Sequence, residues 1–116
     1  MSSTNRSERV LTELYHVRLS KLGHDTLADV LDYAEVVTSP AIPADVVTMY
    51  SQVRVRDRES AQQQVCTLCY PADAEPESGF ISVLSPLGLA LIGRRVGDEV
   101  TCHMPGGGQR RYAIEA

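Results

Sequence analysis

The sequence is poor in aromatic residues and has no long hydrophobic run. Its 116 residues include no tryptophan, one phenylalanine and five tyrosines, so any core must be aliphatic and surfaces on which bases could stack are scarce. The longest stretch without a polar side chain, residues 86–93, is far shorter than the ~18 residues that a membrane-spanning helix needs. The first ten residues contain no apolar stretch that would serve as a signal peptide. We therefore expect a cytoplasmic protein without membrane contacts.

Positive charge is also scarce. Eleven lysines and arginines stand against fifteen aspartates and glutamates, for a formal net charge of −4, which argues against a protein that binds phosphate backbones. The three cysteines, Cys66, Cys69 and Cys102, are an odd number, so a complete disulfide framework is excluded and reduced thiols are expected. The length suits one ordinary domain, or one small domain with an appendage.

The first 39 residues carry a helical pattern that predicts two antiparallel helices. The first is expected over about residues 8–22, after a cap at Thr4 or Ser7, and it ends at Gly23. Its apolar face would hold Val10, Leu11, Leu14 and Val17. The apolar positions of the second helix also follow helical spacing: Leu27, Val30, Leu31 and Ala34. Residues 1–39 are therefore predicted to form a short helical hairpin.

A proline-rich segment, residues 38–43, cannot continue the helix and is expected to be a linker. The remainder, residues 40–116, predicts a second domain of strands separated by polar turns. The predicted strands cover residues 46–50, 52–56, 63–70, 80–84, 99–104 and 109–115.

One helix interrupts these strands, over residues 85–93. Ser85 can cap it, Pro86 suits its first turn because the missing N–H costs nothing there, and Gly93 can adopt the left-handed closing conformation. Residues 105–108 form a hairpin turn. The predicted fold class is α+β, with the helical hairpin followed by a small antiparallel sheet that carries one short helix.

Three segments of the second domain follow one another in a recognisable order. They are SPLGLALIG at residues 85–93, GDEV at residues 97–100 and PGG at residues 105–107. This order resembles the signature of the C-terminal domain of the bacterial transcript cleavage factors GreA and GreB, which has an FKBP-like fold. Residues 43–49 and 67–72 resemble the regulator of nucleoside diphosphate kinase (Rnk) family, a shorter Gre-like relative. The kinase belongs to that family's name and corresponds to no residue here.

The resemblance implies a regulator of transcription elongation that binds bacterial RNA polymerase at the rim of its secondary channel, with no chemistry and no cofactor of its own. In Gre factors the surface that meets the polymerase includes the loop entering the short helix, which corresponds here to Ser85, Pro86 and Leu87. These residues also cap and start a helix, and Leu87 could equally be core. No direct sequence-specific contact with nucleic acid is expected. A monomer is favoured, although the apolar stripes also allow a second copy.

Gre factors insert a long hairpin into the channel and present acidic residues to a metal ion in the polymerase's active centre. The candidates here are Asp25, Asp29 and Asp32, which share one helical face. Asp25 can also be a cap, and a three-acid face is typical of a solvated surface. The predicted first helix would be about 22 Å long, shorter than a Gre hairpin. We therefore predict a factor that competes with Gre cleavage factors for the docking site; the alternative is a compact cleavage factor.

The remaining motifs favour no further chemistry. Cys66 and Cys69 have a CxxC spacing that, with Cys102 and His103, suggests a zinc or redox site. Residues three apart in a strand point to opposite faces, so we predict no metal site. Residues 106–108 lack the Lys-Ser/Thr pair and the helix of a phosphate-binding loop. An FKBP-like fold also allows a prolyl isomerase, but that activity needs an aromatic-lined pocket, which this composition disfavours.

Overall fold

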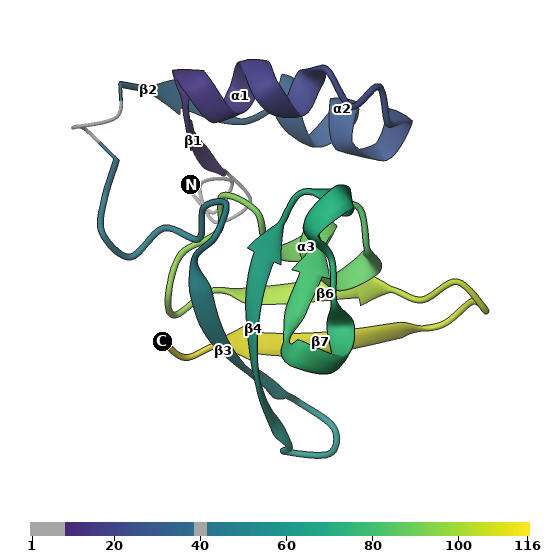
Figure 1. The fold of residues 1–116 in the computed structure, drawn as a ribbon. Helices are drawn as coiled ribbons and strands as arrows, with labels where there is room; N and C mark the ends of the chain where they lie inside the picture. Colours follow the sequence, from purple (N-terminus) through teal and green to yellow (C-terminus); the bar gives the residue numbers. More distant parts are fainter. Residues whose placement is uncertain (1–8, 39–41) are drawn as a thin grey trace.

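The computed structural model describes residues 9–38 and 42–116. The predicted caps Thr4 and Ser7 and the middle of the predicted linker lie outside the described residues. Figure 1 shows two short helices stacked across one end of a curled sheet. The chain therefore mixes helix and sheet, as the sequence predicted.

Five strands form the main sheet, in the order β5-β4-β3-β7-β6. They are β3 (Gln52–Asp57), β4 (Gln63–Cys69), β5 (Phe80–Ser82), β6 (Glu99–His103) and β7 (Gln109–Ile114). All five coincide with predicted strands, because alternating apolar residues bury one face: Val53 and Val55 of β3 are buried, whereas Gln52 and Arg54 are exposed.

The sheet is not wholly antiparallel, which corrects the prediction. β4 and β5 pair in parallel, and Thr67 lies opposite Phe80. The connection between them contains two 3-10 turns, η3 (Pro71–Asp73) and η4 (Pro76–Ser78). This connection is long enough to return the chain to the end of the sheet at which β4 began, so that the next strand runs in the same direction.

The strand predicted at residues 46–50 is wrong. This segment makes turns and one isolated bridge, between Val46 and Arg95. Val47 bonds instead to the segment after the short helix: its N–H donates to Arg94 O (2.7 Å) and its carbonyl accepts from Gly93 N–H (2.8 Å). Tyr50 then adopts a left-handed conformation with φ of 64°, which ends any extended geometry.

The short helix α3 (Pro86–Leu91) is where the sequence placed it. Ser85 is its N-cap and Pro86 its first residue. Gly93 has φ of +78°, and a Cβ added there would lie 2.8 Å from the Cβ of Arg9. The glycine is therefore required both by the left-handed turn and by the close approach of the N-terminal segment.

The N-terminal region differs from the prediction. Residues 10–12 form a strand, β1 (Val10–Thr12), that pairs in parallel with β2 (Glu35–Val37). The first helix, α1 (Glu13–Ser20), begins only after Thr12, whose side chain accepts from Tyr15 N–H. Val10 is held in the strand because its N–H donates to Gly93 O (2.9 Å). The helix predicted over residues 8–22 is thus shortened to eight residues.

The predicted apolar face of the first helix is wrong for the same reason. Leu14 and Val17 are 55% and 52% exposed, because the helix starts later and turns Leu19 toward the core instead. The second helix, α2 (Asp25–Asp32), buries Leu27 and Leu31 as predicted. Its N-cap is His24 and not Asp25.

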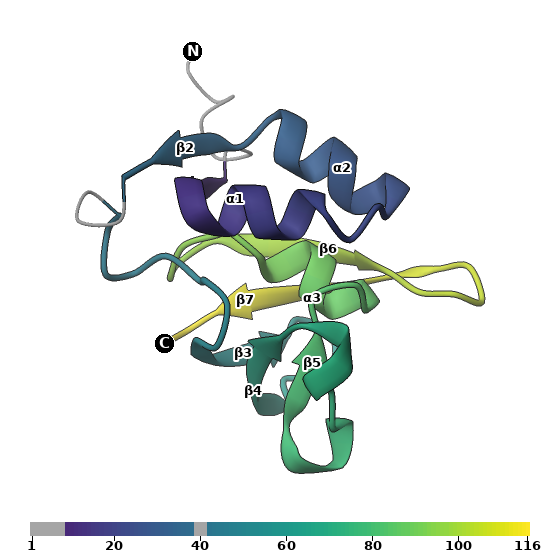
Figure 2. The ribbon, with the colours of Figure 1, turned by 45° about the horizontal axis from the view of Figure 1, so that its top comes forward.

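One hydrophobic core joins the N-terminal helices to the sheet (Figures 1 and 2). Leu11, Leu19, Leu27 and Leu31 belong to the same buried cluster as residues of the sheet and α3. Those partners include Val47, Val55, Leu68, Leu91, Ile92 and Ile114. The domain boundary near residue 40 stays a prediction. Within the described ranges, no helix combines the length and apolar character needed to cross a membrane.

Candidate functional site

The segment that enters α3 is held by its own hydrogen bonds. The Ser85 side chain accepts from Gly88 N–H (3.1 Å) and donates to Ser82 O (2.6 Å). The Ser82 side chain in turn accepts from Leu84 N–H (3.0 Å). Four residues of backbone are therefore fixed before the helix begins, and the cap satisfies one of the otherwise unpaired N–H groups of its first turn.

Gly88 lets the helix pack directly on this segment. A Cβ added to Gly88 would lie 2.1 Å from Ser82 O and 2.9 Å from Val83 Cα. Both neighbours are backbone atoms, so neither can move aside as a flexible side chain would. The first turn of α3 and the end of β5 consequently form one rigid corner of the molecule.

The three residues expected to meet the polymerase lie on this corner. Ser85, Pro86 and Leu87 are all half-buried, and Leu87 packs against the core. The structure thus brings them together at the start of α3, and part of the Leu87 side chain is buried against the core. Their role in binding stays a prediction.

The opposite end of α3 is capped by a residue that sequence reasoning missed. Arg9 Nη1 donates to Leu89 O and to Ile92 O. Burial, reinforced by the nearby charge of Arg94, lowers the pKa of Arg9 to about 10. Positive charge at a helix C-terminus satisfies its last carbonyls. No local signal around Arg9 indicated this role, because its partners lie at the other end of the sequence.

The acidic residues of α2 are solvent-exposed. Asp25 is the first residue of the helix, and Asp29 and Asp32 lie further along it. The cap ahead of them is the His24 side chain, whose Nδ1 accepts from Leu27 N–H (3.4 Å). Among the residues that the structure describes, no three His, Cys, Asp or Glu side chains are grouped so that they could hold a metal ion. That these acids stop short of a metal ion in another protein stays a prediction.

The three cysteines are buried free thiols. Cys66 lies in the core beside Leu68, while Cys69 lies on the other side of β4, where its Sγ contacts Ile81 O (3.4 Å). Cys102 contacts the Met104 sulfur at 3.7 Å. Burial raises the pKa of Cys66 to about 11, so its thiol stays protonated and is a poor nucleophile near neutral pH.

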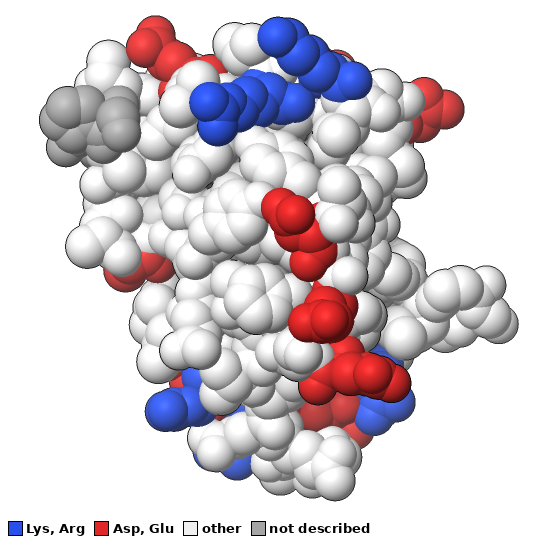
Figure 3. Space-filling view, viewed as in Figure 1, with Lys and Arg blue, Asp and Glu red and all other residues white. Residues whose placement is uncertain are grey.

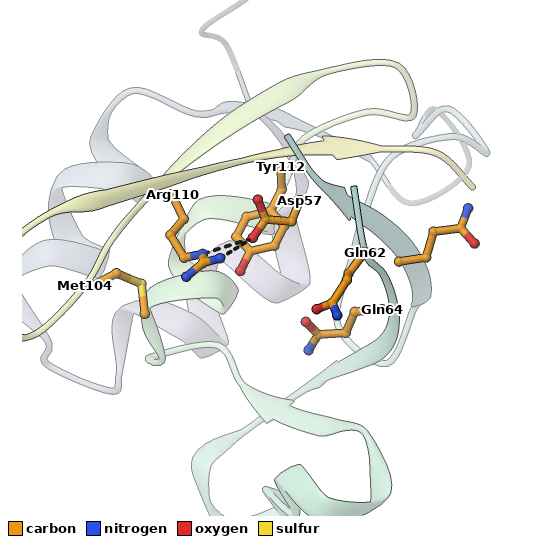
Figure 4. A pocket seen from close by; sticks show the side chains of 7 residues that line it. Asp57, Gln62, Gln64, Met104, Arg110 and Tyr112 are labelled. Carbon is orange, nitrogen blue, oxygen red and sulfur yellow. Dashed lines mark hydrogen bonds and ion pairs between the residues drawn. The ribbon is translucent and has the colours of Figure 1, made fainter. Parts of the chain in front are cut away.

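A pocket of about 300 Å³ opens beside Asp57 and Arg110, neither of which the sequence had marked. Asp57 Oδ1 accepts from the N–H groups of Glu59 (2.8 Å) and Ser60 (3.3 Å), and its Oδ2 accepts from Arg110 Nε (2.9 Å) and Nη2 (2.7 Å). These contacts, the Glu59 N–H first, lower the pKa of Asp57. Figure 4 shows the two side chains bound to each other among the residues that line the cavity.

The lining of this pocket is mainly polar. Gln62, Gln63 and Gln64 lie on one side, with Met104 and Tyr112 nearby. Tyr112 is the one aromatic residue in the lining. A prolyl-binding site needs an apolar, aromatic surface, which this pocket does not provide, and the Asp57–Arg110 pair is best explained as a clamp between the β3 turn and β7.

Comparisons with known proteins agree with the motifs. The family model described as "Transcription elongation factor, GreA/GreB, C-term" matches residues 42–116. The "Regulator of nucleoside diphosphate kinase" of Escherichia coli K12 is 41% identical over 83 residues, covering 72% of this chain and 61% of that protein. A "Transcription elongation factor GreA" of Rhodospirillum rubrum is 38% identical over 81 residues, covering 70% and 52%. The chain thus matches between half and two thirds of the length of these relatives.

Two solved structures extend the comparison to the fold. A "Prokaryotic transcription elongation factor GreA/GreB from Nitrosomonas europaea" superposes with a TM-score of 0.75 at 40% identity, covering 93% of this chain and 95% of that one. The GreA factor homolog 1 of Thermus thermophilus gives a TM-score of 0.54 at 31% identity, covering 79% and 59%. The first match includes most of the N-terminal region, so the likeness is not confined to the sheet.

Proposed function

Because the chain belongs to the GreA/GreB C-terminal family, as its motifs predicted, we propose that it regulates transcription by binding bacterial RNA polymerase at the rim of the secondary channel. The observation that carries this proposal is the family match over residues 42–116, which includes α3 and the segment that enters it. The docking body would be the sheet domain, in the FKBP-like form of the family.

The contact surface would centre on Ser85, Pro86 and Leu87. The rigid corner that holds them supports this role, because a surface that is already ordered loses little conformational entropy on binding. Capping and binding are compatible here: the Ser85 hydroxyl faces the helix backbone, while the half-exposed ring of Pro86 is available to a partner.

We further propose that docking occurs without transcript cleavage and excludes Gre cleavage factors. Each N-terminal helix has eight residues and is about 12 Å long, so the first is roughly half as long as the sequence predicted. The N-terminal region packs on the shared core through Leu11 of β1, Leu19 of α1, and Leu27 and Leu31 of α2. A short element of this kind would stay at the channel mouth, whereas metal chemistry requires carboxylates within about 2.0–2.6 Å of an ion.

Competition for core RNA polymerase tests the docking site. The full chain should displace a labelled Gre factor, and a Pro86→Glu variant should displace it about tenfold less well, the change expected for losing one well-placed interface residue. Pro105→Glu is the matched control, because Pro105 is an exposed turn residue. Circular dichroism must show both variants folded. Equal competition by Pro86→Glu and the parent would refute the surface assignment.

The alternative function, a compact cleavage factor, rests on the exposed acids at the start of α2. A backtracked elongation complex incubated with the protein decides between the two. We expect RNA shortening at the intrinsic rate of the polymerase. Faster shortening that disappears when Asp25 and Asp29 are both changed to Asn would establish the alternative.

A further inference from the structure

The negative charge of this protein is carried by one continuous segment. Residues 59–93 contain no lysine or arginine and four acidic residues, namely Glu59, Asp73, Glu75 and Glu77. Setting these four aside leaves eleven acidic residues, which equal the eleven lysines and arginines of the chain. The formal charge of −4 therefore belongs to the segment from the turn between β3 and β4 to the end of α3, and the formal charges of the remaining residues cancel.

The outer face of β4 and β5 is partly apolar, and part of it is exposed. Cys66 and Leu68 point into the core, so the alternate residues of β4 point outward, and Val65 is 49% exposed. Phe80 lies opposite the outward-facing Thr67 in the β4–β5 pair and is 39% exposed. This is the only phenylalanine of the sequence.

The backbone of Phe80 pairs with the backbone of Glu75 in an isolated bridge. The Phe80 N–H donates to Glu75 O (3.1 Å), and Glu75 N–H donates to Phe80 O (2.8 Å). The two backbones are thereby locked together, with Glu77 two residues further on. No ion pair is found for Glu75 or Glu77 among the residues that the structure describes.

A second aromatic residue, Tyr50, is bonded to an acid of residues 59–93. Its hydroxyl donates to Asp73 Oδ2 (2.6 Å), and its ring packs on Tyr70 with the centroids 6.0 Å apart. Tyr50 nevertheless stays about half exposed. A tyrosine held in this way presents its ring without further loss of side-chain freedom.

We infer that these residues form a docking surface for a basic, arginine-bearing surface of the polymerase. We call it the acidic aromatic face, and it consists of Tyr50, Val65, Asp73, Glu75, Glu77 and Phe80. A guanidinium stacks on an aromatic ring and pairs with a carboxylate at the same time. This face holds both kinds of group, because Tyr50 is bonded to Asp73 and Phe80 is paired through its backbone with Glu75.

Charge and position both support this partner. Figure 3 shows acidic atoms in a column on the face viewed, with lysine and arginine atoms above the column and around its lower end. A field of one sign attracts a partner of the opposite sign and repels a similar one. The inference rests on the proposed function, because it assumes that Ser85–Leu87 contact the polymerase. β5 ends at Ser82, where the segment that presents Ser85–Leu87 begins, so the acidic aromatic face would extend the contact surface of these three residues.

A pair of matched variants tests the charge. Glu75→Lys with Glu77→Lys should weaken binding to core RNA polymerase about tenfold at roughly 50 mM salt and much less at roughly 300 mM. Glu13→Lys with Glu35→Lys makes the same change in net charge at exposed positions elsewhere, and binding should fall less than about twofold. Equal losses in the two variants would overturn the inference. Phe80→Ala should also weaken binding without altering charge, and unchanged affinity would count against the face.

A second measurement does not depend on the polymerase. Amide resonances of the labelled full chain are followed during titration with a capped peptide that contains two arginines. We expect saturable shifts at residues 73–80 and at Tyr50, and their loss in the Glu75→Lys, Glu77→Lys variant. Shifts centred on the acids of α2 would refute the inference. If the polymerase itself does not bind, the proposed function fails and this titration alone decides whether the face recognises arginine.

Discussion

Replacing Leu11 with alanine should destabilise the whole protein, not only its N-terminal region. Leu11 is fully buried in the middle of β1 and belongs to the core cluster that includes Val55, Leu91 and Ile114. Truncating a buried leucine removes its burial energy and leaves a cavity, at a cost of about 2–5 kcal/mol. In a domain of this size that corresponds to a loss of roughly 8–20 °C in Tm.

Leu14→Ala is the matched control. The sequence placed Leu11 and Leu14 on one helical face, but Leu14 is 55% exposed. The same truncation there should change the free energy of unfolding by less than about 0.5 kcal/mol. Urea unfolding followed by circular dichroism measures both variants. Hydrogen exchange at the amide of Leu31, in the last turn of α2, reports whether this helix opens separately.

Three results would refute the reasoning. Leu11→Ala could cost under 1 kcal/mol, roughly half the smallest expected loss, or the Leu31 amide could exchange well before the sheet unfolds; either would mean that the helices do not share the core. A cost for Leu14→Ala as large as that for Leu11→Ala would contradict the exposure of Leu14. A single transition with a large loss for Leu11→Ala alone would support a rigid body in which the helices move with the sheet.

Two further predictions concern buried polar groups. The pKa of Asp57 is lower in the folded protein than its unfolded value of about 3.9. The resulting stability is present above the unfolded pKa and is lost as the pH falls through the folded pKa, so the urea midpoint of the parent should fall more steeply below about pH 4 than that of Asp57→Asn. Parallel curves for the two proteins would contradict this. The Cys66 thiol, whose pKa burial raises to about 11, should resist a thiol reagent at pH 8 until urea is added, and immediate modification of all three cysteines would show that the core opens freely.

The element best predicted from the sequence was α3, because its signals are local. The Ser85 cap, Pro86 at the first position and the left-handed Gly93 each act within a few residues, and the structure confirms all three. The strands were predicted for a similar reason: alternation in β3 reflects which face is buried. The residues of α3 also carried the family resemblance, because caps and turn glycines can be recognised directly in the sequence.

The N-terminal region shows where local pattern failed. Residues 10–12 fit a helix as well as they fit a strand, and the choice between them depends on a backbone bond to Gly93 and on pairing with β2. Neither partner can be identified from the residues around Val10. Once β1 is extended, α1 starts later, so Leu14 and Val17 face solvent and Leu19 turns inward.

The sequence by itself determined the family, the positions of the five strands of the main sheet, and α3 with its Ser85 cap. Only the tertiary structure decided which side chains at distant positions meet. Arg9 caps the far end of α3, Asp57 pairs with Arg110, and Tyr50 is pinned by Asp73. Each contact depends on how the chain closes over its core, and caps, turns and periodicity carry no information about that closure, because they act only between near neighbours in the chain.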